Sequence, residues 1–325
     1  MTPLRAGIVG GGRIAGVHAR AIDTAEDVRL VAVCDLDRER AEAMAGPRGA
    51  AAYVDWREML EAQDLDLLWV ATPPLHHRGP AVAALAAGVH VYLEKPIART
   101  LDDAAAIVDA AGSAAGVCAV GYQWHAGGLL EAARQALAGQ RVGMLVGRNF
   151  GPAAARPWFV DREQGGGQIL ERASHHIDLQ RALAGEVAAV EAFAAGVRLS
   201  GSHDSSIDDA IALVLHFQSG ALGTIHSVWS ANGQPGRYSL DLLGEQATIT
   251  LDLGPAVHRI SGVSKGRTIG AAFGDPMERS IARFVEAARR SDRSLVACPP
   301  DDAIRTLAVA LACERALADG ARVSP

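Results

Sequence analysis

The sequence predicts an α/β protein. Its first part is a doubly wound parallel sheet of the Rossmann type, and its second combines a largely antiparallel open sheet with helices. Short apolar strands that alternate with helical segments indicate the first part. Strand-like runs joined by glycine turns indicate the second. A chain of 325 residues can form two cores, so we expect one domain over residues 1–121 and another over residues 122–325.

The first domain is expected to contain six strands. They cover Leu4–Val9, Arg29–Cys34, Ala51–Tyr53, Leu67–Ala71, Val89–Leu93 and Val117–Val120. The helical segments between them cover Ile14–Ile22, Arg38–Ala45, Trp56–Ala62, Arg78–Ala87 and Leu101–Ala114. Apolar strands with amphipathic crossovers form parallel sheets that helices cover on both faces.

The second domain is expected to contain an antiparallel sheet of five or six strands. The strand-like runs are Val187–Arg198, Ala210–Phe217, Ala221–Trp229, Arg237–Leu243, Ala247–Leu253 and Val257–Ile260. The helices are Leu129–Leu137, Ile169–Leu183, Met277–Arg290 and Asp301–Ala318. The pattern leaves open whether the C-terminal helix packs back on the first domain.

The run Ala210–Phe217 is apolar on both of its alternating faces. A sheet with helices on one side and water on the other should carry polar residues on its outer face. We therefore expect another subunit to cover that face, in a homodimer or homotetramer formed through the C-terminal sheet. The alternative is a long loop of the same chain.

Composition and charge narrow the class of protein. A hydrophobic fraction of 49% and a net charge of −6 are those of an ordinary globular protein, so we expect no nucleic-acid partner. No apolar stretch is long enough to span a membrane, and because the first strand is predicted to begin within a few residues of the start, we expect no signal peptide. The cysteines lack a C-x-x-C pair, which predicts buried free thiols in a cytoplasmic protein. They are Cys34, Cys118, Cys298 and Cys313.

A glycine motif directly after the first strand predicts a dinucleotide site. Gly10, Gly12 and Ala15 form G-x-G-x-x-A before a helical segment that begins with Arg13 and Ile14. The glycines allow a tight turn and a close approach to a pyrophosphate, and the N–H groups of the helix start face the phosphates. We assign Gly10, Gly12, Arg13 and Ile14 to cofactor binding. The alternative is a glycine turn in some other βαβ unit.

Asp35 ends the second strand, 23 residues beyond Gly12, where a carboxylate binds the adenosine ribose hydroxyls. Its charge, with that of Asp37, repels a 2′-phosphate and favours NAD over NADP. Arg38 and Arg40 could bind that phosphate, but they lie past the end of the strand.

The chain resembles the Gfo/Idh/MocA oxidoreductases, the family of glucose–fructose oxidoreductase and inositol dehydrogenase, over nearly its whole length. The segments that carry the resemblance are Gly10–Ala15, Asp35, Ala71–His77, Ala87–Ala98 and Gly165–Asp178. The resemblance implies an NAD-dependent dehydrogenase that acts on a CH–OH group of a sugar, inositol or related polyol. Two alternatives are an NAD-assisted glycosidase of the same superfamily, whose members tend to lack the lysine of Glu-Lys-Pro, and a non-catalytic NAD-binding regulator.

Lys95, in Glu94-Lys95-Pro96, follows the fifth strand, where doubly wound sheets bind ligands. Beside a cationic nicotinamide, the ammonium form of a partly desolvated lysine is disfavoured, so its amine can exchange a proton with a substrate hydroxyl. The resemblance makes Lys95 the catalytic residue, in contact with cofactor and substrate, and places Glu94 near the nicotinamide ribose. The alternative is a surface lysine paired with Glu94.

The resemblance implies further cofactor contacts. They come from Thr72 and Pro73 at the end of the fourth strand, from His77, and from Gln123 after the sixth strand. Two consecutive prolines, Pro73 and Pro74, should hold the chain extended. Tyr122 and Trp124 suit the core and sugar stacking equally.

Glu171, His175 and Asp178 are spaced by four and three residues, so on one helix they share a face. The resemblance makes His175 a catalytic or substrate-orienting histidine supported by Asp178. Glu171 stands where the family usually has a catalytic, substrate-binding aspartate. A core histidine is the alternative for His175, and His176 is expected to be structural.

Trp158 is a candidate substrate contact, and Gly165–Gly167 is expected to be a flexible loop over the substrate site. A metal site is not expected. Adjacent histidines, as in His76-His77 and His175-His176, point about 100° apart on a helix and cannot easily bind one ion.

Overall fold

The computed structural model describes residues 2–25, 27–152, 157–197, 199, 206–230, 236–254 and 258–325. Contacts between Cα atoms group the chain into two compact units. The first contains Met1–Tyr122 with Ser280–Ile304, and the second contains Gln123–Arg279 with Arg305–Pro325. Residues Ser280–Ile304 thus join the first unit, although they lie in the range expected for the second domain.

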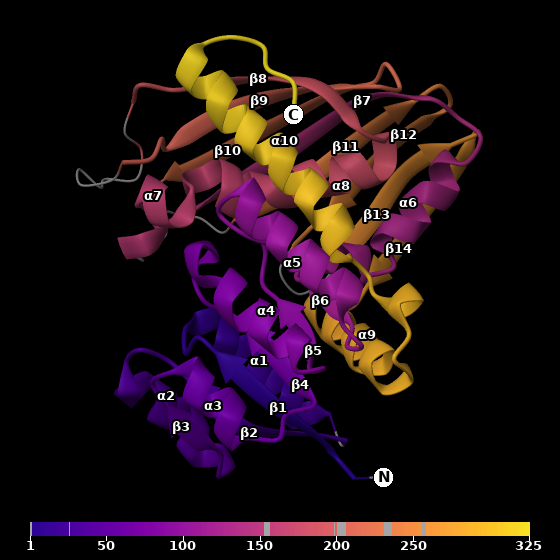
Figure 1. Ribbon diagram of the computed structural model, residues 1–325. Coiled ribbons are helices and arrows are strands. Elements are labelled where there is room, and N and C mark those ends of the chain that lie inside the picture. The colour runs from indigo at the N-terminus through magenta and orange to yellow at the C-terminus, as the bar shows by residue number, and fades with distance from the viewer. Residues whose placement is uncertain are drawn as a thin grey trace. The chain divides into compact units, whose positions relative to one another are not determined.

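The first unit is built on a six-stranded parallel sheet in the order β3-β2-β1-β4-β5-β6, which confirms the Rossmann prediction. Its strands are β1 (Leu4–Val9), β2 (Val28–Cys34), β3 (Ala51–Tyr53), β4 (Leu67–Val70), β5 (His90–Leu93) and β6 (Cys118–Val120). The helices are α1 (Arg13–Thr24), α2 (Arg38–Ala45), α3 (Trp56–Ala62), α4 (Arg78–Ala86) and α5 (Leu101–Ser113), as Figure 1 shows.

An aromatic cluster ties a later helix into the first unit. The rings of Trp69 on β4 and Tyr92 on β5 pack against Phe284 of α9 (Pro276–Arg290), with centroids 5.3 and 5.5 Å from that of Phe284. The Tyr92 hydroxyl lies 3.0 Å from Ser280 Oγ. All three aromatic side chains are fully buried, so α9 completes this core.

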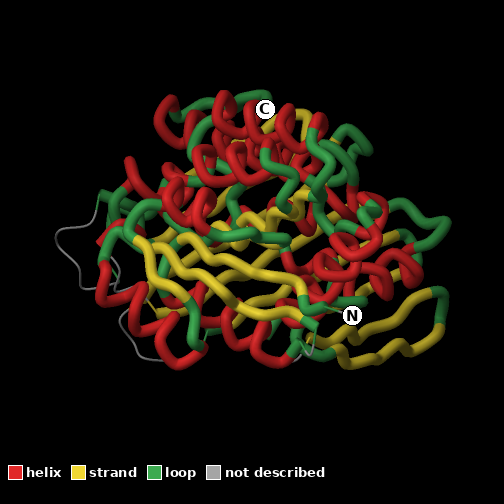
Figure 2. The backbone as a smooth tube through the Cα atoms, turned by 60° about the horizontal axis from the view of Figure 1, so that its bottom comes forward, coloured by secondary structure: helices red, strands yellow, loops and turns green. Residues whose placement is uncertain are grey.

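The second unit contains an eight-stranded sheet in the order β14-β13-β12-β11-β7-β10-β9-β8. The β7–β10 pair is parallel and the other pairs are antiparallel. The strands are β7 (Val142–Pro152), β8 (Val187–Ala194), β9 (Ala210–Phe217), β10 (Leu222–Ser230), β11 (Arg237–Gly244), β12 (Ala247–Asp252), β13 (His258–Ser264) and β14 (Arg267–Phe273). Figure 2 shows strands in yellow and helices in red.

Two strands of this sheet were not predicted, which raises the count from six to eight. The sequence of β7 contains three glycines and no regular alternation, and β14 is an edge strand whose residues are mostly exposed. Neither has the apolar period of two on which the prediction relied. The strand expected to reach Arg198 ends at Ala194, and Arg198 lies outside the described residues.

Helix α8 (Ser174–Ala184) packs directly on the sheet, and two glycines allow its close approach. A Cβ atom at Gly147 of β7 would lie 2.7 Å from His176, and one at Gly223 of β10 would lie 2.2 Å from Gln180 Oε1. The rest of the helical layer is α6 (Leu129–Leu137), which contacts β12 and β13, and α10 (Pro300–Asp319). The helix expected from Ile169 begins instead with a π-helical turn, Ile169–Ala173. Over five residues, apolar spacing does not distinguish the two helix types.

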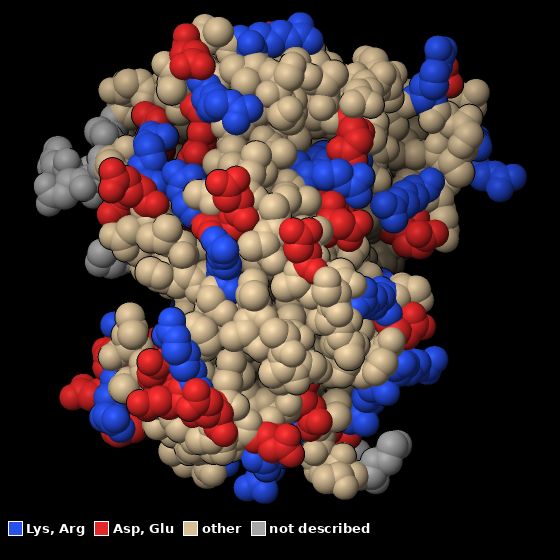
Figure 3. Space-filling view, viewed as in Figure 1, with Lys and Arg blue, Asp and Glu red and all other residues tan. Residues whose placement is uncertain are grey.

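All four cysteines are free and buried, as predicted. Among the described residues, no helix combines the length and apolar character needed to cross a membrane. On the face drawn in Figure 3, Lys and Arg side chains are interspersed with Asp and Glu side chains.

Candidate active site

The glycine turn after β1 has the predicted geometry. Gly10 has a φ of +100°, and its N–H donates to the carbonyl of Cys34 at 2.7 Å. A Cβ atom at Gly10 would lie 2.6 Å from the carbonyl oxygen of Ala71, so only glycine fits between the ends of β1 and β4. At Gly12 no atom of the described residues lies within 4 Å of the Cβ position, which leaves open space above the start of α1.

The first turn of α1 lacks the side-chain cap that three other helices of this unit have. Asp37, Asp55 and Thr100 cap α2, α3 and α5 with their side chains. The N-cap of α1 is Gly12, no side chain caps it, and no acidic residue lies in the first turn. Uncapped N–H groups and a positive helix end suit a pyrophosphate, so this turn fits a dinucleotide.

Asp35 is fixed at the end of β2 by two backbone donors. Its carboxylate accepts hydrogen bonds from Gly11 N at 2.6 Å and from Asp37 N at 2.9 Å. The guanidinium of Arg40 lies 3.8 Å from Asp35 and 2.9 Å from Asp37. Because two carboxylates already neutralise Arg40, it is poorly placed to attract a 2′-phosphate.

The segment after β4 carries Thr72, Pro73 and His77. Thr72 Oγ1 is buried and has no hydrogen-bond partner in the described part of the chain, so it could bond to a cofactor. Pro73 is extended as predicted, but Pro74 opens a 3-10 turn over Pro74–His76, so only the first proline holds the chain straight.

The buried ring of His77 braces this segment. Its Nε2 lies 2.9 Å from the carbonyl oxygen of Thr72 and its Nδ1 lies 3.2 Å from that of Ile97. Burial lowers the pKa of His77, against the opposing effect of these carbonyl contacts. Cofactor binding by the ring itself stays a prediction.

A buried histidine–carboxylate pair lies under the Glu-Lys-Pro turn. His18 Nε2 of α1 is 2.7 Å from Glu94 Oε1, and the N–H of Lys95 donates to Glu94 Oε2 at 3.2 Å. Burial alone would raise the pKa of Glu94, but the hydrogen bond and charge of His18 and the charge of Lys95 outweigh it and lower that pKa. Glu94 is therefore held as a carboxylate, and it fixes the backbone of Lys95 at the end of β5.

Sequence reasoning missed His18. It lies three residues after Ala15 of the glycine motif, so it faces the sheet one helical turn further along. A polar residue at a position that must be buried was the available signal.

In the second unit, Trp124 packs beside two histidines of α8. Its ring centroid lies 5.1 Å from that of His175 and 5.3 Å from that of His176. Trp124 is 7% exposed and therefore belongs to the core of the second unit, and Tyr122 is likewise buried in the core of the first unit. Gln123 directly precedes Trp124, and its buried Oε1 has no hydrogen-bond partner among the described residues.

His175 is half-buried, whereas His176 is fully enclosed and structural, as expected. His176 Nε2 lies 3.1 Å from the carbonyl oxygen of Ser239. Burial lowers the pKa of His176 to about 4. Glu171 lies in the π-helical turn before α8 and is 5% exposed. The acid and base candidates Glu171, His175 and Asp178 therefore come from one short segment.

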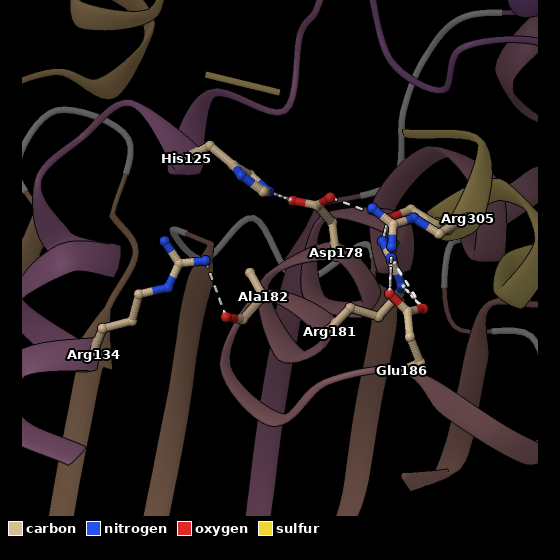
Figure 4. Close-up of polar contacts among 8 residues, drawn as sticks. His125, Arg134, Asp178, Arg181, Ala182, Glu186 and Arg305 are labelled. Atoms are coloured by element: carbon tan, nitrogen blue, oxygen red, sulfur yellow. Dashed lines mark hydrogen bonds and ion pairs between the residues drawn. The ribbon is translucent and has the colours of Figure 1, made fainter. Parts of the chain in front are cut away.

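Asp178 is held by residues other than the expected one (Figure 4). Its Oδ2 lies 2.7 Å from His125 Nε2, and its Oδ1 accepts from Thr306 Oγ1 at 3.1 Å. The support that we expected Asp178 to give His175 therefore goes to His125, which sequence reasoning missed. His125 ends the Gln-Trp-His segment after the sixth strand, and this place in the chain was its only signal.

The lower part of the same cluster anchors α8. Arg181 donates to Thr306 Oγ1 at 2.7 Å and to Glu186 at 2.8 Å, and Arg305 donates to Glu186 at 3.0 Å (Figure 4). Arg181 is 5% exposed, so the Glu186 carboxylate compensates its buried charge.

Trp158 packs against an apolar cluster, with its ring centroid 5.3 Å from that of Phe159. It remains half-buried, and contact with a substrate stays a prediction. Arg156, which precedes Trp158 by two residues in the sequence, lies outside the described residues.

The expectation of a flexible loop at Gly165–Gly167 is wrong. These glycines form a buried turn in which Gly166 and Gly167 have φ values of +73° and +64°. Cβ atoms there would lie 2.9 Å from Leu170 and 2.8 Å from Ile207, so packing demands glycine.

Comparison with known proteins identifies the family. Residues 4–122 match the model described as "Oxidoreductase family, NAD-binding Rossmann fold", and residues 130–250 match the GFO/IDH/MocA C-terminal domain. The 1,5-anhydro-D-fructose reductase of Ensifer adhaerens is 30% identical over 233 residues, which make up 70% of this chain and 69% of that protein. The D-glucoside 3-dehydrogenase of Escherichia coli is 28% identical over 275 residues, 77% of each chain.

A solved structure agrees over the full length. The WlbA dehydrogenase from Bordetella pertussis, in complex with NADH and UDP-GlcNAcA, has a TM-score of 0.84 and 27% identity, with 99% of both chains covered. The matches to the two domain models and to these relatives establish that the chain belongs to the GFO/IDH/MocA family of oxidoreductases.

Proposed function

We propose that this protein is an NAD-dependent oxidoreductase that transfers a hydride between a hydroxyl or ketone of a sugar, inositol or related polyol and the nicotinamide. One observation carries the proposal most directly. The carboxylate of Glu94, itself held by His18, fixes the backbone of Lys95 at the end of β5. In the same sheet, β4 alone separates β5 from β1 and its uncapped glycine turn.

The first unit supplies the residues for the cofactor. Asp35 takes the adenosine ribose, and the start of α1 takes the pyrophosphate. The full set is Gly10, Gly12, Arg13, Ile14, Asp35, Thr72, Pro73, His77, Glu94 and Lys95, with Gln123 of the second unit. Bound NAD supplies the hydride acceptor. The neutralised Arg40 favours NAD over NADP.

Two residues carry the proton transfer in this proposal. The Lys95 amine takes the proton from the substrate hydroxyl when the substrate is oxidised and returns it when a ketone is reduced. His175 orients the substrate and shares the proton. Glu171, Asp178 and Trp158 complete the substrate contacts, with Glu171 accepting hydrogen bonds from hydroxyl groups.

The named activities of the relatives support a sugar or polyol substrate. The Ensifer adhaerens relative is a reductase of 1,5-anhydro-D-fructose, and the Escherichia coli relative is a dehydrogenase of D-glucosides. Lys95 favours this activity over an NAD-assisted glycosidase.

A substrate panel tests the proposal. Sugars, inositols and polyols would be screened for absorbance of reduced nicotinamide, with NAD and NADP in parallel and with the matching ketones and NADH for the reverse reaction. We expect at least one substrate to produce NADH, with higher kcat/KM for NAD than for NADP. Release of free sugar from a glycoside without net NADH would instead identify a glycosidase. Tight NAD binding with no turnover in either direction would identify a regulatory protein.

We also infer a homodimer or homotetramer formed through the C-terminal sheet. Met144, Leu243 and Val263 are cross-strand neighbours in one row over β7, β11 and β13, with Thr248 of β12 between the last two. Their exposed fractions are 37%, 39% and 46%. Such a row on an open sheet face favours a second subunit. Sedimentation that detects monomer alone would contradict this inference.

Residues 1–121 are proposed as the NAD-binding domain and residues 122–325 as the domain for substrate binding and assembly. The four buried free thiols favour the cytoplasm as the compartment of this protein. Fractionation of cells that express the protein at its natural level would test that placement.

A further inference from the structure

Among the described residues, the buried side chain of Arg172 has no anionic partner. It lies in the π-helical turn Ile169–Ala173, directly after Glu171, and is 8% exposed. No carboxylate of the described residues lies within salt-bridge distance of its guanidinium. Burial accordingly lowers its pKa. Arg181, the other strongly buried arginine among the described residues of this unit, differs because Glu186 pairs with it.

Neutral groups from three strands hold the guanidinium in place. Nη2 donates to Asn149 Oδ1 of β7 at 2.7 Å and to the Tyr238 hydroxyl of β11 at 3.2 Å. Nη1 reaches the carbonyl oxygen of Val228 of β10 at 3.4 Å. Asn149 also donates to the Arg172 carbonyl at 3.2 Å, which orients the amide and therefore its acceptor oxygen.

The surroundings favour a fixed cation. The guanidinium carbon lies 5.5 Å from the ring centroid of Trp229 and 5.6 Å from that of Tyr238, within the range of cation–π attraction. A Cβ atom at Gly151 would lie 2.9 Å from Nη2, so the glycine leaves room for the group. Of the five N–H donors of an arginine, these contacts use three, and Nε has no acceptor in the described part of the chain.

We propose that Arg172 binds a negatively charged group, a carboxylate or a phosphate, on the sugar or polyol substrate. A buried charge is costly unless an opposite charge compensates it, and a planar guanidinium with free donors matches a carboxylate or phosphate in geometry. His175 lies one helical turn beyond Arg172, so both belong to the segment that supplies the proposed substrate residues. The inference rests on the proposed function and narrows its substrate to an anionic sugar.

The competing explanation is that Arg172 is purely structural and only links β7, β10 and β11 through its hydrogen bonds. Binding measurements distinguish anion binding from this structural role. D-glucuronate, D-glucose 6-phosphate and D-glucose would be titrated calorimetrically into the protein with NADH present. Hydrogen bonds to a charged group predict that one anionic sugar binds about 10- to 100-fold tighter than D-glucose. The tighter of the two anionic sugars identifies the carboxylate or the phosphate as the group bound.

In the Arg172→Gln variant, the ratio of the affinity for the anionic sugar to the affinity for D-glucose should fall close to one. Arg148→Gln is the matched control, because Arg148 is also an arginine of this unit but pairs with Asp241 on the outer face of β7, and it should leave the preference unchanged. If Arg172→Gln does not fold, Arg172→Lys can be used instead. It keeps the positive charge but loses the planar guanidinium that donates two parallel hydrogen bonds, so it should weaken anion binding at least several-fold.

Equal affinity of the wild-type protein for all three sugars would overturn the inference, as would a folded Arg172→Gln variant that keeps the preference. These readouts do not depend on turnover. Preferential binding of an anionic sugar that no assay shows to be oxidised or reduced would support this inference while contradicting the proposed function. Turnover of neutral polyols at rates that Arg172→Gln leaves unchanged would support the proposed function while contradicting this inference.

Discussion

Replacement of His18 by leucine should destabilise the protein strongly, and more at alkaline than at acidic pH. His18 is fully buried, and Glu94 is 7% exposed, with 2.7 Å between Nε2 and Oε1. Removing one partner of such a pair leaves a buried carboxylate uncompensated, which costs about 3–5 kcal/mol. For a unit of this size, that loss lowers the melting temperature by roughly 10 °C.

The pH dependence follows from the direction of the pKa shift. In the wild-type protein the pKa of Glu94 is lowered from 4.5, so the pair contributes stability at higher pH and loses it as the pH falls through that pKa. Without His18, burial dominates and raises the pKa of Glu94, so protonation favours the folded variant. The deficit relative to wild type should therefore be largest near about pH 8 and smaller near about pH 5.

Urea denaturation and calorimetry at both pH values would measure this difference. His76→Ala, at an exposed histidine, is the matched control and should change stability by less than about 0.5 kcal/mol. His18→Gln, which keeps an N–H donor, should recover part of the loss. A His18→Leu variant as stable as the control, or one whose deficit grows on acidification, would refute the reasoning.

Three further substitutions test other parts of the account. Asp35→Ser removes the ribose carboxylate and one of the two carboxylates beside Arg40, so the ratio of kcat/KM for NAD over NADP should fall at least about tenfold; an unchanged ratio would mean that the ribose is bound elsewhere. Gly10→Ala forces an unfavourable backbone angle and a contact of 2.6 Å with a carbonyl oxygen, so NADH affinity in a fluorescence titration should drop at least about tenfold, and wild-type affinity would contradict the turn geometry. His125→Leu leaves the buried Asp178 with the Thr306 hydroxyl as its one remaining partner among the described residues, so urea denaturation should show a loss of about 3 kcal/mol, whereas a loss below about 1 kcal/mol would show that the pair is not needed.

The sequence was sufficient for features that depend on neighbouring residues. The glycine turn, Asp35 at the end of β2 and the alternation of strands and helices are local patterns, and each appears where it was predicted. Fold and cofactor class follow from these patterns because the backbone geometry of the turn tolerates few residue types.

Contacts between distant residues could not be predicted. His18 and Glu94 are 76 residues apart, and His125 and Asp178 are 53 apart, so no spacing rule connects them. The packed glycine turn at Gly166 and Gly167 resembles a flexible loop in sequence, because only their neighbours Leu170 and Ile207 show why glycine is needed. The partners of Arg172 come from three separate strands and become visible only in the folded chain.

The central claim is that the amine of Lys95 exchanges the substrate proton. Its direct measurement is the kcat of Lys95→Met on the best substrate of the panel, with NADH affinity determined by fluorescence titration on the same sample. The account predicts that kcat falls by at least about 100-fold while NADH affinity stays within a few-fold of wild type. A variant that binds NADH normally and turns over at the wild-type rate would contradict it.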